Sequence, residues 1–189
     1  RTGLLGSAPH ALVDTERGVN NTIYSNSNQA QDAYDDVNAF YSNGFQLKGQ
    51  GNAGCSNYGQ GSTTTAKYSS WTFRKQKGFF DVVTYTGTGS ALTINHNLGC
   101  IPGMIIVKCT SAVKSWIVYN RGLNGGVNPE QYAMILNATN AQSQNIGYWN
   151  NTAPTATQFT LGDSAANENG ETHVAYLFAG GASDEPGAA

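Results

Sequence analysis

The chain has 189 residues, enough for one large or two small domains. Charged residues make up only 12% and the formal net charge is −2. The one basic cluster, residues 74–77, is too short to form the stripe of Lys and Arg that binds nucleic acid. No apolar run reaches the roughly 18–20 residues that cross a bilayer. We therefore expect neither a nucleic-acid partner nor membrane insertion.

The cysteines and the first residue bear on how the protein is made. Cys55, Cys100 and Cys109 are odd in number and lack the paired spacing of a metal site, so we expect thiols in a protein made in a cytoplasm, without a disulfide framework. Residue 1 is Arg, which predicts either processing or a start inside a longer product. The sequence calls for no cofactor.

Taken in chain order, the predicted elements are almost all strands. Residues 30–41 come nearest to a helical period and could hold one short helical turn. Residues 43–49 and 68–75 are strand-like. From residue 79 onward, alternation and β-branched or aromatic content predict strands at residues 79–85, 91–97, 104–110, 115–121, 132–137, 146–151, 158–162 and 173–181. Many short strands with Gly, Pro and Asn between them indicate an all-β, antiparallel β-sandwich or jelly-roll-like fold.

Two of these strands allow finer predictions. The apolar run at residues 104–108 is typical of a central strand that is buried on both faces. In the strand that follows Lys114, Trp116 and Val118 share one face while Ile117 and Tyr119 share the other. We expect Trp116 to be buried, and Trp71 as well.

The two halves of the chain resemble each other at an offset of about 105–115 residues, the size of a domain duplication. Residues 17–31 resemble residues 121–142, and both begin with Arg-Gly and end with Ala-Gln. Further along, residues 43–49 match residues 157–163, with Phe45 opposite Phe159 and Leu47 opposite Leu161, and residues 68–75 match residues 173–180, with Trp71 opposite Tyr176 and Phe73 opposite Phe178.

This repeat predicts the domain organisation. Residues 79–182 form one complete β-sandwich unit, residues 1–78 correspond to the second half of an earlier copy, and residues 183–189 form a flexible tail. An incomplete sandwich leaves strand edges unpaired. Its missing strands would come from upstream or from another subunit. Alternatively, the first half folds by itself, or packs on the second half so that both share one sandwich.

A family resemblance rests on several strings. Residues 71–108, the W-x-VY-x-RG motif from Trp116, residues 148–162 and residues 170–180 together resemble an uncharacterised β-rich domain family of marine bacteriophages, cyanophages in particular. The piece that starts at His96, H-x-LG-x-x-P-x-x-IIVK, is similar to segments of phage tail-fibre and receptor-binding proteins. The resemblance covers residues 15–181 and implies a virion component, often in tandem copies. It brings no catalytic residues.

Candidate chemical sites are few. His96 has no nucleophile or carboxylate partner in its motif, so we expect it to hydrogen-bond the backbone of the turn that follows. Acidic and amide side chains at residues 32–38 and 163–171 could supply oxygen ligands for Ca²⁺, but neither group has the spacing of an EF-hand, and no metal site is assigned. No acid pair suggests glycoside hydrolysis, so we do not expect an enzyme.

Aromatic residues near turns suggest binding. Tyr and Trp offer flat apolar area, and Asn and Ser offer adaptable hydrogen bonds, a combination that suits a glycan or a protein surface. Tyr58 and Tyr68 have such neighbours. The main candidates for an exposed patch are Tyr148, Trp149, Tyr119 and Asn150. For the aromatic members, the alternative is a place in the core.

We therefore expect a phage virion protein, made in the host cytoplasm and carried on the particle surface. As a tail-fibre or surface-fibre component it would assemble as a homo-oligomer, a trimer or larger, bind other virion proteins, and present loops to a host surface glycan or protein. The alternatives are a capsid decoration protein and an extracellular filament subunit that polymerises by strand donation.

Overall fold

The computed structural model describes residues 10–33, 37–47 and 69–181, and the structural statements below concern these ranges. The protein is all-β and antiparallel, which confirms the predicted fold class. The strands are β1 (Ala11–Leu12), β2 (Ile23–Tyr24), β3 (Val37–Tyr41), β4 (Gly44–Leu47), β5 (Phe80–Thr86), β6 (Leu92–Asn95), β7 (Pro102–Cys109), β8 (Ile117–Asn120), β9 (Tyr132–Ile135), β10 (Ser143–Gln144), β11 (Gln158–Leu161) and β12 (Thr172–Ala179). Two short 3₁₀ helices, η1 (Leu123–Gly126) and η2 (Pro129–Gln131), precede β9.

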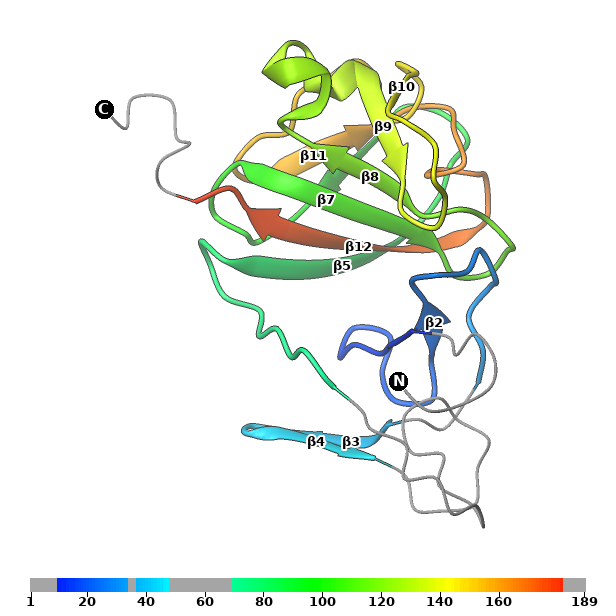
Figure 1. The fold of residues 1–189 in the computed structure, drawn as a ribbon, viewed down its shortest axis with the longest axis vertical. Helices are drawn as coiled ribbons and strands as arrows, with labels where there is room; N and C mark the ends of the chain where they lie inside the picture. The colour runs from blue at the N-terminus through cyan, green and yellow to red at the C-terminus, as the bar shows by residue number, and fades with distance from the viewer. Residues whose placement is uncertain (1–9, 34–36, 48–68, 182–189) are drawn as a thin grey trace.

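The main sheet has six strands in the order β10-β9-β8-β7-β12-β5, each antiparallel to its neighbour (Figure 1). β7 lies between β8 and β12, so the predicted central position of residues 104–108 is confirmed. Residues 104–107 are apolar at four consecutive positions, because other parts of the chain cover both faces of the strand. β5 and β10 are the two edge strands.

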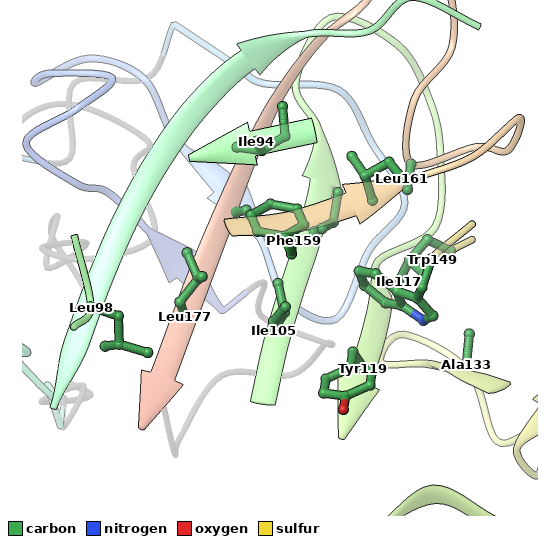
Figure 2. Packing of buried hydrophobic residues seen from close by; sticks show 13 residues of the cluster. Ile94, Leu98, Ile105, Ile117, Tyr119, Ala133, Trp149, Phe159, Leu161 and Leu177 are labelled. Atoms are coloured by element: carbon green, nitrogen blue, oxygen red, sulfur yellow. The ribbon is translucent and has the colours of Figure 1, made fainter. Parts of the chain in front are cut away.

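A second layer, the antiparallel pair β6–β11, covers the inner face of this sheet. Ile94 of β6 lies opposite Phe159 of β11, and both point into the core with Leu161 (Figure 2). They pack on residues of β7, β8 and β12 such as Ile105 and Leu177. The apolar alternation of each strand thus becomes the interior of a sandwich, and removing these side chains from water stabilises the fold.

The outer face of the sheet is covered by residues 10–33, which contain β1 and β2. Ile23 is fully buried there with Phe80, Trp116 and Tyr176. The indole N–H of Trp116 donates to the carbonyl oxygens of Tyr24 at 3.0 Å and of Ser27 at 2.9 Å. The predicted burial of Trp116 is therefore confirmed, and its hydrogen bonds attach the N-terminal segment to the sheet.

A polar cluster adds to this attachment. The hydroxyl of Tyr176 donates to Asp14 Oδ2 at 2.7 Å and accepts a hydrogen bond from Arg17 Nη2 at 3.2 Å. Arg17 Nε also pairs with Asp14 Oδ2 at 2.7 Å. Burial raises the pKa of Tyr176 well above its ordinary value, so the phenol stays protonated as a donor. These three residues join positions far apart in sequence.

The hairpin β3–β4 lies apart from the main sheet (Figure 1). The strand-like residues 43–49 contain β4, as expected from the sequence. The helical turn considered for residues 30–41 is wrong for the described part of that range, because Val37–Tyr41 forms β3 and pairs with β4. Cross-strand hydrogen bonds decide the local structure here over a weak helical period.

Two other expectations are corrected. Residues 146–151 form turns and no strand, because Asn150 and Asn151 adopt left-handed backbone with φ of 51° and 48°. Trp71 is 85% exposed and not buried, because residues 69–75 run along the molecule without joining a sheet. Strand-like composition alone does not provide a partner for hydrogen bonding.

Residues 10–33 of the first half thus pack on the outer face of the main sheet, while the β3–β4 hairpin lies apart from it. The domain boundaries at residues 78 and 182 remain predictions, and the tail at residues 183–189 lies outside the described ranges. No helix in the described part of the chain has the length and apolarity that a membrane crossing requires.

Candidate functional site

The residues predicted to form an exposed patch lie around the end of the core next to η2. Trp149 is fully buried, and its indole N–H donates to the carbonyl oxygen of Tyr132 at 3.0 Å. Tyr119 is 3% exposed and meets the Trp149 ring edge-on, with centroids 5.6 Å apart (Figure 2). Burial raises the pKa of Tyr119 to about 12. Tyr148 is half-buried and Asn150 is exposed.

The exposure predicted for Trp149 and Tyr119 is therefore wrong. Their neighbours in sequence are polar, but the rings pack between the turn at residues 145–152 and the main sheet. Packing between segments distant in sequence decides this burial. Tyr148 and Asn150 are the members of the predicted patch that retain accessible surface, and a binding role for them stays a prediction. Tyr58 and Tyr68 lie outside the described ranges.

His96 has the structural role expected from the sequence. Its Nδ1 accepts a hydrogen bond from the backbone N–H of Leu98 at 3.2 Å, inside the turn that leads to β7. Burial lowers the pKa of His96, which favours the neutral ring that this acceptor role requires. The same turn is held by Asp81, whose Oδ2 accepts from the N–H of Asn97 at 2.7 Å.

The most distinctive surface feature is the outer edge of β5, on the side that faces β2 and the β3–β4 hairpin (Figure 1). The N–H of Ala179 donates to the carbonyl of Phe79, and the N–H of Gly87 donates to the carbonyl of Glu171. These two bonds establish which residues of β5 direct their backbone groups towards β12. Residues of an antiparallel strand turn their backbone groups alternately to one neighbour and to the other. Thr84 and Thr86 therefore direct their N–H and C=O groups away from β12.

Part of this edge is already occupied. Phe80 exchanges backbone hydrogen bonds with Gln76 in an isolated bridge, and the carbonyl of Val82 accepts from Lys75 Nζ at 3.1 Å. Within the described ranges, no hydrogen bond reaches the outward backbone groups of Thr84 and Thr86. The open stretch is short and bears exposed threonines. Such an edge can accept another strand.

A polar hollow of about 420 Å³ lies beside this edge on the outer face. The lining includes threonines from three adjacent strands or their ends: Thr84, Thr86, Thr110 and Thr172. The hydroxyls of Thr110 and Thr172 lie 2.7 Å apart and bond each other. Residues 16–17 and Gln31 of the N-terminal segment also line it, together with Tyr85 and His173. The hollow offers hydroxyl, amide, carboxylate and guanidinium groups beside backbone that has no partner among the described residues.

A second exposed feature, the aromatic segment, comprises residues 69–79 and leads into β5. Trp71 is 85% exposed, Phe73 49% and Phe79 48%. The Phe73 ring packs against Phe80 and Phe178 with centroids 5.5 and 5.6 Å apart, so one side of it is fixed to the sheet. Aromatic rings at this exposure are typical of surfaces that bind another molecule.

The charged groups beside the aromatic segment hold it in place. Lys75 Nζ pairs with Glu16 at 2.9 Å and with Asp81 at 3.2 Å, and Arg74 Nη2 donates to the carbonyl of Ser42 at 2.6 Å. Burial lowers the pKa of Lys75, but its carboxylate partners outweigh burial and raise the pKa overall. The short basic cluster thus serves intramolecular contacts.

Sequence reasoning did not single out the β5 edge or the exposure of the aromatic segment. The alternation in residues 80–86 predicts a strand, but the number of its neighbours is set by the order of the sheet.

The relationship of the chain to known proteins comes from a family model. The model of the family described as a domain of unknown function, DUF7483, matches residues 5–183. The chain belongs to the DUF7483 family. No curated protein and no solved structure matches it.

Two of the loop residues of this DUF7483 chain that were considered for Ca²⁺ have other roles. Asn167 is fully buried and bonds the backbone around it, while Glu168 pairs with Lys114 at 2.6 Å. In the described ranges, no three His, Cys, Asp or Glu side chains gather closely enough to hold a metal ion. Asp35 and Asp36 lie outside those ranges.

Proposed function

We propose that this DUF7483 protein is a structural and adhesion component of a bacteriophage virion. In this proposal it forms part of a tail fibre or surface fibre, assembles with copies of itself through its β-rich surfaces, and presents loops to the host surface. The phage assignment is supported by the sequence resemblance across residues 15–181. The assembly role is supported by the exposed aromatic segment.

The observation that carries the proposal is the contrast between the two matched halves. Tyr176 in β12 is 6% exposed, whereas Trp71, its counterpart in the first half, is 85% exposed. Phe159 is 1% exposed, whereas its counterpart Phe45 is half-buried. Tyr176 and Phe159 are covered by other layers of the fold, whereas their counterparts Trp71 and Phe45 keep exposed surface. Apolar positions of this kind are covered when subunits associate.

The experiment is to determine the mass of the purified chain by native mass spectrometry and its appearance by electron microscopy, over a hundredfold range of concentration. We expect a trimer, a ring or a filament that builds up with concentration. A threefold particle supports the fibre, and an open filament supports the strand-donation alternative. A monomer at every concentration contradicts a self-assembling role.

A further inference from the structure

Two unpaired features of the same chain are complementary. The first is the outward edge of β5 at Thr84 and Thr86, described above. The second is the backbone of residues 69–75, for which no backbone–backbone hydrogen bond is found within the described ranges. In the part of the chain that the structure describes, one feature is a strand edge without a neighbouring strand, and the other is a segment that joins no sheet.

We propose that residues 69–74 of one copy add as a strand to the open edge of β5 in a second copy. The inference rests on the proposed self-assembly and names the surfaces that carry it. Backbone hydrogen bonds to Thr84 and Thr86 supply the attachment, as in other cases of strand addition to a sheet edge. The occupant of this edge is thus a second copy of the chain.

The sequence of the segment favours this partner. Residues 68–75 match residues 173–180, which include most of β12, and β12 is the strand that pairs with β5 at its other edge. The aromatic segment therefore has the alternation of a strand that already pairs with β5 in the complete unit. Trp71 and Phe73 lie on one side of an extended segment and Thr72 and Arg74 on the other.

Polar surface and space at the edge also fit this segment. An added strand turns alternate side chains towards the hollow, whose lining includes Thr84, Thr86, Glu16 and Arg17. The side that carries Thr72 brings a hydroxyl to these threonine hydroxyls, while Arg74 keeps its bond to the Ser42 carbonyl of its own copy. Trp71, on the opposite side of the segment, then lies on the inner face of the second copy, next to Val83 and Tyr85, which pack against the inner core.

Packing directs the segment away from the edge of its own copy. The backbone reverses between Gln76 and Phe80, and the bridge between these two residues ends the pairing there. Phe73 then turns onto Phe80 and Phe178, both of which belong to the outer core cluster or pack against it. The added segment, residues 69–74, is the donor surface, and the open edge of β5 is the acceptor surface. Because these two surfaces differ, each copy can bind one neighbour through its segment and another through its edge, which produces a ring or an open chain.

The test uses one variant for each surface. Thr84→Pro removes the outward N–H of the edge, and Thr84→Val retains it as the matched control. Since proline could disturb β5 itself, Thr84→Lys with Thr86→Lys is a second acceptor variant that places charges at exposed positions. Trp71→Ala is the donor variant, and Tyr41→Ala, at a tyrosine 58% exposed, is its control.

Sedimentation velocity on the full chain measures assembly, and far-ultraviolet circular dichroism checks the fold of each variant. We expect the acceptor variants and Trp71→Ala each to weaken self-association at least tenfold, while Thr84→Val and Tyr41→Ala assemble like the wild type. A mixture of Trp71→Ala and Thr84→Pro should form a one-to-one dimer that grows no further, because it contains one intact pair of surfaces.

The outcomes separate this inference from the proposed function. If the wild type assembles and the acceptor and donor variants assemble equally well, the strand-addition interface is wrong while self-assembly stands. If the folded variants are monomeric but their mixture forms no dimer, the head-to-tail pairing is wrong. If the wild type remains monomeric at every concentration, the inference and the assembly role both fail.

Discussion

Lys108 lies in the interior of the protein, although lysine side chains are ordinarily exposed to water. Its side chain is fully buried, and Nζ donates to the carbonyl oxygens of Cys109 at 2.7 Å, Lys114 at 2.9 Å and Asn28 at 3.3 Å. Burial lowers its pKa to about 8, so the ammonium group is still protonated at neutral pH and has three protons for three acceptors. The lysine thereby ties the end of β7 to the N-terminal segment.

Replacing this lysine tests that role. Lys108→Met keeps much of the side-chain volume but leaves the three carbonyls without their donor, and we expect the free energy of unfolding to fall by about 2–4 kcal/mol. Urea unfolding followed by tryptophan fluorescence measures the change. Lys114→Met, which removes a partly exposed ion pair with Glu168, is the control and should cost under about 1 kcal/mol. Equal effects in the two variants would contradict a structural role for Lys108.

His96 makes stability depend on pH. Because burial lowers its pKa below the ordinary 6.5, the unfolded chain takes up a proton at this residue before the folded chain does. The contribution of His96 to the free energy of unfolding is therefore complete above pH 6.5 and is lost as the pH falls through the pKa of the folded chain. The free energy of unfolding falls by at most about 1.4 kcal/mol per pH unit.

His96→Asn keeps an acceptor for the N–H of Leu98 but cannot titrate. Urea unfolding at a series of pH values from 7.5 down to 5 should therefore show a shallower loss of stability below pH 6.5 in this variant than in the wild type. His10→Asn, at an exposed histidine, is the control. An unchanged slope in His96→Asn would rule out His96 as a source of the pH dependence.

At the scale of elements, the loop between β11 and β12 is fixed to the turn after β5. Asn167 accepts from the N–H of Thr88 at 2.9 Å and donates to the carbonyls of Gly162 at 2.9 Å and Ser90 at 2.5 Å. The backbones are so close that a Cβ on Gly87 would lie 2.1 Å from the carbonyl oxygen of Glu168. Glycine at that position is required by this approach.

Asn167→Ala should loosen the connection between these loops. The substitution removes the partner of the Thr88 N–H and of the carbonyls of Gly162 and Ser90, so we expect a loss of about 2–4 kcal/mol in the free energy of unfolding. Asn169→Ala, two residues along the same loop but exposed, should change stability by less than about 0.5 kcal/mol. Thermal unfolding of both variants is the measurement, and comparable shifts would show that position 167 has no special role.

At the scale of the whole molecule, the N-terminal segment depends on contacts with β12. Tyr176→Phe removes the hydroxyl that joins Asp14 and Arg17 to the sheet, and we expect a loss of about 1–3 kcal/mol in the free energy of unfolding. Trypsin should also cleave after Arg17 faster than in the wild type, because the segment opens more often.

Tyr41→Phe removes an exposed hydroxyl that bonds Gln46 in the separate hairpin, and it serves as the control for this experiment. Its cleavage after Arg17 should match the wild type. If Tyr176→Phe is cleaved at the wild-type rate, the outer apolar cluster around Ile23 holds the segment without help from the polar cluster.

How far the sequence predicts the structure depends on whether a feature is local. Alternation and turn residues predicted β5, β6, β7, β8, β9, β11 and β12 to within a few residues, and the short-range bond of His96 as well. These follow from side-chain direction and backbone preference over a few positions. The candidate site was far less predictable, since Trp149 and Tyr119 sit beside polar residues in sequence yet pack together in the core.

The sequence by itself determined the β class, most strand positions and the two faces of β8, because period and turn chemistry are carried by neighbouring residues. Only the tertiary structure decided that Trp149 is covered and Trp71 is open, that β5 ends the sheet, and that residues 10–33 lie on its outer face. Burial and edge position depend on which distant segments meet, and this is settled by the packing of the whole chain.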